Sequence, residues 1–379
     1  MTQINPFLTI RQAVKTHYET YVYPQFPLLS SVRKCDTYAL NLESLWARFN
    51  GEKLYLEDKR ILLAGCGGFS PYPTAVANPN VKITALDISK ANLQRAKFHT
   101  WLHFYFNVDF IESDLGDTPT VLGDDRFDFI DCYGVLHHIP NICSALKLIH
   151  SLLQEGAFVR IMIYSSCARK PVQSAANAMK IMKISDVNAI RALYKKTREG
   201  NRFKSCVDSS YESRFDWGLA DLFLHPYAKT YPLNELLALL NEAHLEPLLF
   251  THQGALSDVK AEIARLRMLE TSRRLSTNFI LFAGRTEDSG RRRKWQEEKI
   301  KNDTLISLNP VIKKSLPLLP FLSLKPSSKL GFENPSIDAK GRFLLSKFKK
   351  PLRKSAIDPV QLATVEKYLQ ALFLIETAS

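Results

Sequence analysis

With 379 residues, of which 45% are hydrophobic and 23% charged, the chain has an ordinary globular composition and enough length for one large domain and a smaller part. No stretch approaches the ~18 uninterrupted apolar residues of a membrane span, and residues 1–20 lack the apolar core of a secretory signal, so we expect a cytoplasmic protein without a transmembrane segment. The net charge of +13 is concentrated between Arg285 and Lys354, where 18 Lys and Arg stand against 7 Asp and Glu; this indicates either an anionic partner, such as nucleic acid or a membrane surface, or solvated charge alone.

Short apolar runs alternate with helical stretches from Arg60 onward, after an N-terminal helical segment over residues 1–59. This alternation is typical of βαβ units around a parallel sheet. Ser89 is placed to begin a helix that continues to Phe104, and a second helix runs over Ile142–Gln154 and is closed by Gly156. The first five strands are predicted over Arg60–Cys66, Lys82–Ile88, Asp109–Glu112, Phe127–Tyr133 and Ala157–Tyr164.

The alternation breaks after Tyr164, where Lys170–Asn201 is helical, polar and rich in lysine. An insertion at this edge would lie over the carboxyl ends of the strands, where open α/β folds bind ligands. We therefore predict a helical cap over residues 170–230. A helix over Leu233–Ala243 and strands over Pro247–Thr251 and Asn278–Ala283 then complete a doubly wound, seven-stranded Rossmann-like α/β domain over residues 60–284.

Residues 285–379 are predicted to form a basic linker and a small helical segment. Arg291–Lys294 is a run of four basic residues, and the Leu-, Pro- and Lys-rich stretch up to about Ser328 has only weak periodicity, as a linker does. Val360–Leu374 has apolar residues at helical spacing. We therefore expect the domain over residues 60–284 to fold without this extension.

A glycine-rich loop, Ala64-Gly65-Cys66-Gly67-Gly68-Phe69, follows the first predicted strand. Glycine lets the backbone turn sharply and approach a ligand closely. Asp87 ends the second strand and is placed either to bind the ribose hydroxyls of a cofactor or to cap the helix beside Ser89. Asp114, after the third strand, is either a partner for an adenine amino group or a turn residue. Up to this point the pattern fits NAD and S-adenosylmethionine equally.

The six cysteines are scattered, without a CxxC pair and without histidines at zinc-finger spacing. This distribution predicts reduced thiols and no structural metal. The residues are Cys35, Cys66, Cys132, Cys143, Cys167 and Cys206.

Five segments in order resemble the motifs of class I S-adenosylmethionine-dependent methyltransferases: ILLAGCGGFS (61–70), ITALDIS (83–89), FIESDL (110–115), FDFIDCYGVLHHIPN (127–141) and LLQEGAFVRIMIY (152–164). VKTHYETYVYPQFP (14–27) and GLADLFLHPYAKTYPLNELLALLNEAHLEP (218–247) are similar to a bacterial small-molecule-type subgroup. The likeness covers about residues 14–284. Two departures are Leu63 and Ala64 where an acidic residue is usual, and Phe69 in place of the third glycine.

The resemblance implies S-adenosylmethionine as the cofactor, held by Gly65, Cys66, Gly67, Asp87 and Asp114, with backbone or apolar contacts from Ile88, Leu115 and Tyr133. Proton removal from the acceptor is assigned to one of His137, His138 and His225. The alternatives are that the first two pack against the sheet or cap a helix at Pro140, and that His225 fixes a turn. Tyr18 and Tyr23 either close over the cofactor or pack in the core.

The methyl acceptor is expected to be an oxygen or nitrogen of a small molecule. An NAD-dependent dehydrogenase would have glycine at Ser70. A (D/N)PPY segment and a Pro-Cys nucleophile, which mark two nucleic-acid methylation chemistries, are absent from the sequence. Two alternatives remain: an RNA-directed methyltransferase that uses the basic tail for phosphate contacts, and a module that binds the cofactor without catalysis.

Overall fold

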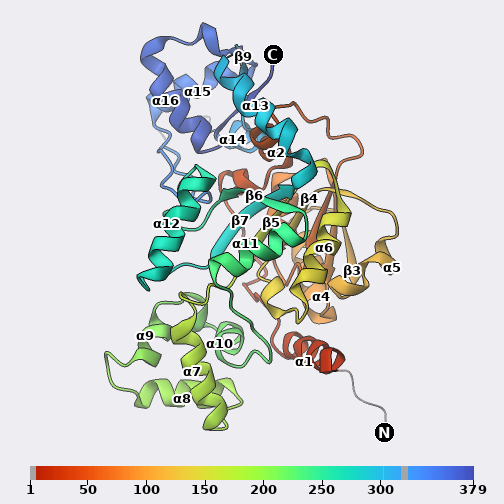
Figure 1. Cartoon of the computed structure of the whole chain (residues 1–379), viewed down its shortest axis with the longest axis vertical. Coiled ribbons are helices and arrows are strands. Elements are labelled where there is room, and N and C mark those ends of the chain that lie inside the picture. Colours follow the sequence, from red (N-terminus) through yellow and green to blue (C-terminus); the bar gives the residue numbers. More distant parts are fainter. Residues whose placement is uncertain (1–5, 302, 317–322) are drawn as a thin grey trace.

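A seven-stranded sheet forms the middle of the molecule in the computed structural model, which describes residues 6–301, 303–316 and 323–379 (Figure 1). Its strand order is β3-β2-β1-β4-β5-β7-β6, and β7 is antiparallel to both of its neighbours. The predicted doubly wound α/β fold is confirmed. The strands are β1 (Arg60–Ala64), β2 (Lys82–Asp87), β3 (Val108–Glu112), β4 (Phe127–Tyr133), β5 (Leu153–Ile163), β6 (Leu245–Phe250) and β7 (Phe279–Arg285).

The strand order reverses at β1, which pairs in parallel with β2 on one side and with β4 on the other. The crossovers on either side of this point leave the sheet in opposite directions, so a crevice opens beyond the carboxyl ends of the strands. The glycine-rich loop follows β1, and Asp87 ends β2. Both therefore lie at this crevice.

Two helical layers cover the sheet, because successive side chains of a strand point to opposite faces. Leu63 faces a core with η1 (Lys34–Leu40), α2 (Leu42–Asn50), α3 (Pro71–Ala77) and α4 (Lys90–Leu102). Leu62 faces a second core with α6 (Ile142–Leu152), α11 (Leu233–Glu242) and α12 (Val259–Thr271). The short elements η2 (Leu115–Asp117), α5 (Thr118–Leu122) and η3 (Leu136–His138) connect β3, β4 and α6.

The predicted cap is present as four helices and a short turn, around a small core of its own that includes Met179, Ile190 and Phe223. Tyr231 returns to the sheet beside Ser165, so the insertion leaves and re-enters the fold at one place. The cap and α1 (Pro6–Thr20) lie at the same end of the molecule (Figure 1). The cap elements are α7 (Lys170–Ile181), α8 (Val187–Lys196), α9 (Arg202–Asp208), η4 (Glu212–Arg214) and α10 (Asp216–Phe223).

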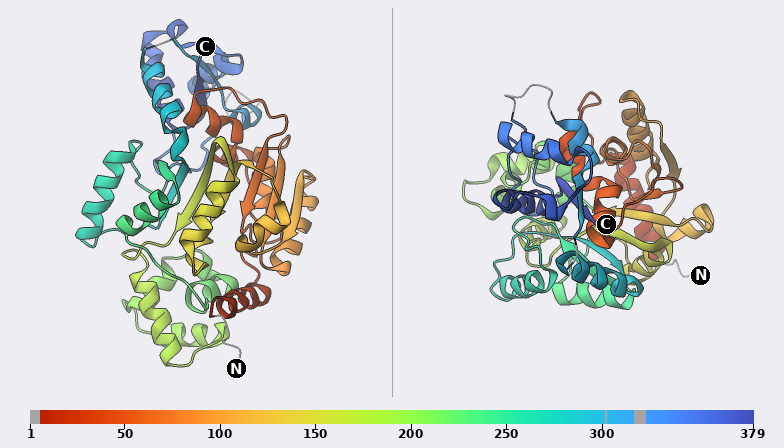
Figure 2. Two further views of the ribbon diagram at one scale, coloured as in Figure 1. Left: turned by 45° about the vertical axis from the view of Figure 1, so that its right-hand side comes forward. Right: turned by 90° about the horizontal axis from the view of Figure 1, so that it is seen from above.

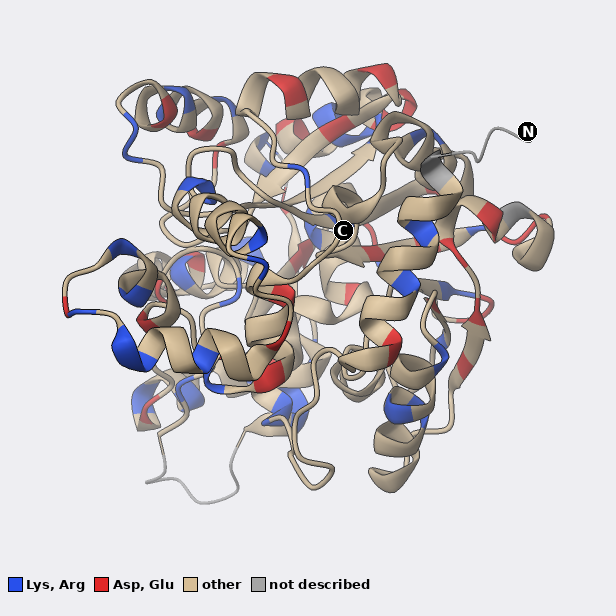
Figure 3. Cartoon of the chain, turned by 90° about the horizontal axis from the view of Figure 1, so that it is seen from below, with Lys and Arg blue, Asp and Glu red and all other residues tan. Residues whose placement is uncertain are grey.

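The charge of the cap is mostly positive. Residues 170–208 contain nine Lys and Arg against three Asp and Glu. Figure 3, which looks at this end of the molecule, shows these basic residues spread along the helices of the cap. The basic character of the chain is therefore not confined to its C-terminal part.

The linker expected up to Ser328 is a wrong prediction, because the chain after β7 is folded over most of this stretch. The helices and strands after β7 form a C-terminal unit at the end of the molecule opposite the cap (Figure 2). Its three strands form an antiparallel sheet in the order β10-β8-β9. The unit comprises η5 (Thr286–Asp288), α13 (Ser289–Lys301), β8 (Leu305–Leu308), α14 (Pro310–Ser315), α15 (Ala339–Ser346), η6 (Lys347–Lys349), β9 (Leu352–Arg353), η7 (Lys354–Ala356), α16 (Pro359–Gln370) and β10 (Leu374–Thr377).

The C-terminal unit shares a core with the N-terminal elements η1 and α2. Tyr38 and Phe373 are both fully buried, with ring centroids 5.3 Å apart. The Asn309 side chain donates to the carbonyls of Tyr38 and Leu372, at 3.2 and 2.8 Å. Trp295 of α13 lies so close to Gly51 that any side chain there would collide with it. The extension is therefore part of the main core.

Several predicted element ends differ from the structure, and three of them, all at the ends of predicted helices, have a backbone reason. The helix expected over Val360–Leu374 ends at Gln370, because Leu372 has a φ of +59° and Leu374 begins β10. Gly156, expected to close a helix, lies within β5 at a φ of +75°. The helix expected to reach Phe104 ends at Leu102, and Phe104 has a φ of +63°.

Many basic residues between Arg285 and Lys354 have acidic partners within the chain. Arg291 is paired with Glu52, and Arg292 is buried beside Asp288 and Glu246. Two further pairs are Arg353–Asp303 and Lys354–Glu376. Part of the positive charge therefore stabilises the fold. No helix within the described ranges is long and apolar enough to cross a membrane.

Candidate functional site

A cavity of about 640 Å³ lies at the crevice beyond the carboxyl ends of β1, β2 and β4. Its walls come from the glycine loop, the strand ends, α1, the N-terminal part of α6 and the cap. All eight residues predicted to bind the cofactor line it: Gly65, Cys66, Gly67, Asp87, Ile88, Asp114, Leu115 and Tyr133. The sequence motifs therefore converge on a single space of the size that small ligands occupy in proteins.

The glycine loop adopts a conformation that side chains disfavour. Gly65 and Gly67 have φ angles of +82° and +58°. A Cβ atom on Gly65 would lie 2.4 Å from Val135 Cγ2, and one on Gly67 would lie 2.7 Å from the carbonyl oxygen of Tyr23. Both positions therefore require glycine for the turn and for close packing.

Asp87 is 5% exposed and is held by donors from the loop and from α4. Its Oδ2 accepts from Gly67 N at 2.7 Å, and its Oδ1 accepts from Ser89 N at 2.9 Å and Asn92 Nδ2 at 3.3 Å. Burial raises the pKa of Asp87, and these hydrogen bonds oppose the rise. A carboxylate accepts about four hydrogen bonds, so about one position remains for a ligand. Asp87 thus fixes the loop and also faces the cavity.

Asp114 and Arg11 stand together at another part of the cavity wall. Asp114 Oδ1 accepts from Gly116 N at 2.7 Å, which makes it the cap of the turn η2. Its other oxygen is 3.3 Å from Nε of Arg11, which comes from α1 and also pairs with Asp117. Asp114 is therefore a turn residue that also lines the cavity, and its role toward an adenine amino group stays a prediction.

The N-terminal segment and the cap meet over the cavity through tyrosine–carboxylate pairs. Tyr18 donates to Asp221 at 3.3 Å, and Tyr23 donates to Glu212 at 3.0 Å. All four residues line the cavity. Burial raises the pKa of Glu212 and raises that of Asp221 to about 7. Sequence reasoning missed both carboxylates, because neither lies beside a strand end and the resemblance of residues 218–247 assigned no role to Asp221.

His138 is the candidate base that the structure places on the cavity wall. Its Nδ1 is 2.8 Å from the carbonyl oxygen of Tyr227. A carbonyl only accepts, so Nδ1 carries the proton and Nε2 keeps its lone pair. Burial lowers the pKa of His138 to about 3, which keeps the ring neutral.

His137 and His225 are not among the residues that line the cavity. His137 is fully buried and stacks on Tyr164, with ring centroids 3.5 Å apart. His225 is 7% exposed and stacks on His138, with ring centroids 3.7 Å apart. Both rings contact that of His138 without lining the cavity, so the structure does not support either as the base.

Two residues of the glycine loop have side chains that point into the protein. Phe69 contacts the rings of Phe26 and His99, at centroid distances of 4.9 and 5.1 Å. It belongs to an aromatic cluster outside the set of cavity residues, so its replacement of a glycine does not fill the cavity. Cys66 is 2% exposed, and burial raises the pKa of its thiol well above the ordinary value.

Comparison with known proteins agrees with this geometry. A family described as "Methyltransferase domain" matches residues 56–217. An uncharacterized protein of Synechococcus sp. is 28% identical over 240 residues, which are 59% of this chain and 56% of that protein. The ubiquinone biosynthesis O-methyltransferase of Alkalilimnicola ehrlichii is 33% identical over 119 residues, which are 31% of this chain and 44% of the relative. The chain thus spans about half the length of the curated relatives it matches.

Among solved structures, PKMT2 from Rickettsia typhi superposes with a TM-score of 0.57 at 16% identity, over 94% of this chain and 77% of that protein. A second structure of PKMT2, in complex with AdoHcy, gives a TM-score of 0.56 at 15% identity over 94% and 78% of the two chains. At this identity the likeness concerns the fold. It extends beyond the matched domain into the C-terminal unit.

Proposed function

We propose that this chain, whose residues 56–217 match a methyltransferase domain, is a class I S-adenosylmethionine-dependent methyltransferase that transfers a methyl group to an oxygen or nitrogen of a small molecule. The observation that carries the proposal is the convergence of all eight motif residues on one cavity at the switch point of the sheet. The relatives named as O-methyltransferases support the same reaction class.

The cavity fits S-adenosylmethionine by the chemistry of its walls. Gly65 and Gly67 line the cavity, where the resemblance places the cofactor. Asp87 has about one acceptor position left for a ribose hydroxyl, fewer than the two that the resemblance implies. The resemblance assigns Asp114 to the adenine and Ile88 and Leu115 to backbone or apolar contacts, and all three line the cavity.

The bound cofactor supplies an electrophilic methyl group on a sulfonium. The chain has to align the acceptor with that methyl group and accept or shield its proton. His138, Tyr164 and Asp221 also line the cavity and are not among the eight residues assigned to the cofactor. His138 presents a neutral ring with a lone pair on Nε2. Because burial makes it a weak base, its role is to orient the acceptor by a hydrogen bond.

The structure gives less support to the two alternative functions, an RNA-directed methyltransferase and a non-catalytic binding module. An RNA acceptor was suggested by the basic tail, but several of its arginines and lysines are paired within the chain. A purely binding module was suggested by Phe69, which packs away from the cavity. Neither observation favours the alternative over methyl transfer.

Asp87→Ala tests the cofactor site. The change leaves a ribose hydroxyl and the loop donors without a partner, so S-adenosylmethionine should bind about 1 to 3 kcal/mol more weakly, as measured by calorimetry. Asp109→Ala is the matched control, since Asp109 is an exposed aspartate of β3 that pairs with Lys82 at 3.3 Å. Equal affinities for both variants and the unchanged chain would remove Asp87 from the site.

His138→Ala tests the acceptor side. Once a screen has found an acceptor, the variant should lower kcat/KM for it while leaving the affinity for S-adenosylmethionine unchanged, because the ring contacts the acceptor and not the cofactor. Full activity of the variant would show that the acceptor does not reach His138.

A further inference from the structure

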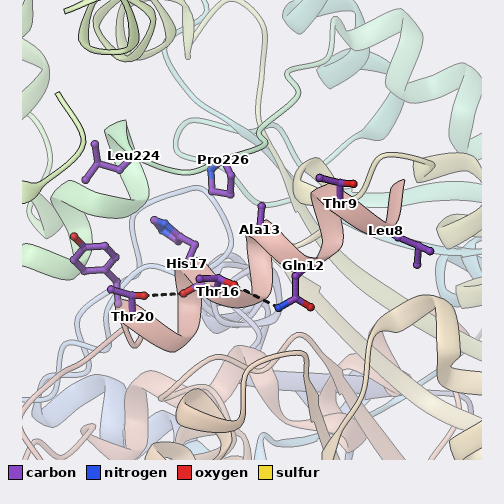
Figure 4. Close-up of a pocket in the computed structure, with 10 residues that line it drawn as sticks. Leu8, Thr9, Gln12, Ala13, Thr16, His17, Thr20, Leu224 and Pro226 are labelled. Carbon is purple, nitrogen blue, oxygen red and sulfur yellow. Dashed lines mark hydrogen bonds between the residues drawn. The ribbon is translucent and has the colours of Figure 1, made fainter. Parts of the chain in front are cut away.

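Three buried side chains that could bind a metal ion meet where α1 packs against the cap. They are His17 of α1, Asp221 of α10 and His225, which follows α10 by two residues. One nitrogen or oxygen atom of each lies within 4.8 Å of those of the other two. Their exposed fractions are 9%, 7% and 7%. Figure 4 shows the His17 ring directed from α1 toward the segment that carries Leu224 and Pro226.

Each of the two imidazoles of this cluster has one ring nitrogen without a hydrogen-bond partner in the described part of the chain. Nε2 of His17 and Nε2 of His225 are both buried without a partner within the described part of the chain. Asp221 accepts one hydrogen bond, the long one from Tyr18. Buried polar atoms are almost always paired, and an unpaired one costs about 1 to 3 kcal/mol. Two such atoms beside a carboxylate therefore point to a ligand that this set of atoms would bind.

We propose that His17, Asp221 and His225 bind a divalent metal ion of the zinc class. Two imidazole nitrogens and one carboxylate oxygen suit such an ion, and three protein ligands leave a coordination position open. The ion would satisfy both buried nitrogens at once. If His225 binds the ion through Nε2, its proton has to lie on Nδ1. Nδ1 can then no longer accept the 3.2 Å hydrogen bond from Tyr227 N, so that hydrogen bond has to break.

An approach to the site exists from outside the molecule. A groove of about 730 Å³ runs along α1 and is bordered by Leu224 and Pro226, and His17 lines it (Figure 4). On the other side, Asp221 lines the cavity of the proposed methyl transfer. The ion would therefore lie in the wall between groove and cavity.

The function that this position supports is to fasten α1 to the cap. His17 belongs to α1, whereas both other ligands belong to the cap, and Tyr18 beside His17 reaches into the cavity. A bound ion would fix the separation of these two elements and with it one wall of the cavity. The site does not depend on methyl transfer, and it would exist in a chain that binds no cofactor.

The test is titration of the purified full-length chain, freed of metal by a chelator, with Co²⁺ and Zn²⁺. We expect one Co²⁺ per chain, detected by its visible absorption and displaced by Zn²⁺, and a rise in Tm with either ion. His17→Ala and His225→Ala should weaken metal binding by more than about a hundredfold. The reason is that mutating even a residue that only hydrogen-bonds to a metal ligand lowers metal affinity about ten- to a hundredfold.

The controls separate this site from adventitious binding and from misfolding. His150→Ala removes a surface histidine that pairs with Glu287 and should bind the ion normally. Asp221→Asn keeps the size of the side chain. It replaces a histidine variant in the metal titration if circular dichroism shows that the histidine variant fails to fold. No stoichiometric binding, or equal binding by the cluster variants and His150→Ala, would overturn the proposal. S-adenosylmethionine binding, measured in parallel, reports on the proposed function separately.

Discussion

Gly67 shows how a single residue sets the shape of the cofactor loop. Its φ of +58° and the carbonyl of Tyr23, 2.7 Å from where a Cβ would lie, exclude a side chain for two separate reasons. Gly123 has a similar φ of +55° but nothing within 4 Å of that position. The two glycines therefore form a natural pair for separating backbone strain from close contact.

Gly67→Ala should lower stability by more than Gly123→Ala, for which left-handed strain alone predicts about 1 kcal/mol. It should also weaken S-adenosylmethionine binding, because the loop has to move away from Tyr23, whereas Gly123→Ala should not. Denaturant unfolding and calorimetric titration of both variants measure these differences. Equal losses would mean that the contact with Tyr23 has no role in shaping the loop.

At the residue scale, the sequence indicated the cavity residues at strand ends and also Tyr18 and Tyr23, but it gave no sign of Arg11, Glu212 or Asp221. Gly65, Gly67 and Asp87 follow buried strands at family spacing, which is a local signal. Arg11 and Asp221 reach the cavity from α1 and the cap, and only the tertiary packing brings them there. Neither local signals nor cysteine spacing could indicate a metal cluster whose ligands are about 200 residues apart.

The helix α12 is anchored by one buried ion cluster. Glu262 is fully buried and accepts from His252 at 2.7 Å and from Arg265 at 2.7 Å. Burial alone would raise the pKa of Glu262, but these hydrogen bonds lower it to about 2. Because the folded-state pKa is depressed, the stabilisation is present above the ordinary pKa of the carboxyl group and is lost as pH falls toward 2.

Glu262→Gln should therefore destabilise the protein by about 3 kcal/mol at pH 7, the cost of leaving a buried charge partner unpaired. The difference from the unchanged chain should shrink below about pH 4.5 as the unfolded carboxyl becomes protonated. Urea unfolding at several pH values measures it. A difference that stays constant from pH 7 to pH 3 would contradict the assigned pKa shift.

At the element scale, the strands of the main sheet could be predicted because their buried runs are continuous and their connections are regular. Apart from the helix α16, the C-terminal elements could not, because most of them are short or bury few residues. In α13 the buried residues are Arg292 and Trp295, so the helix has no apolar stripe. The end of α16 was predicted too late in the chain, because the apolar run continues through Leu372 and Leu374 into β10.

At the scale of the whole molecule, one of the cores is continuous from the N-terminal elements η1 and α2 to the C-terminal unit. This revises the expectation that the domain folds without residues 285–379. Removal of residues 303–379 would expose the faces of η1 and α2 that pack against Phe373 and Ile306. We therefore expect this truncation to aggregate, as followed by size-exclusion chromatography. A monomer with an unchanged Tm would restore the original expectation.

A milder change tests the same packing. Phe373→Ala should cost about 3 to 5 kcal/mol, as large-to-small changes of buried aromatic residues do. Phe343→Ala, at a phenylalanine of the same unit that is 68% exposed, should change stability by no more than about 0.5 kcal/mol. Similar effects of the two changes on denaturant unfolding would show that the C-terminal unit is not packed on the main core.

The central claim is that the crevice of this sheet binds S-adenosylmethionine. Calorimetric titration of the full chain with S-adenosylmethionine and S-adenosylhomocysteine, with NAD as the control ligand, tests it most directly. We predict micromolar binding of the first two and none of NAD. Binding of NAD, or of none of the three, would contradict the claim.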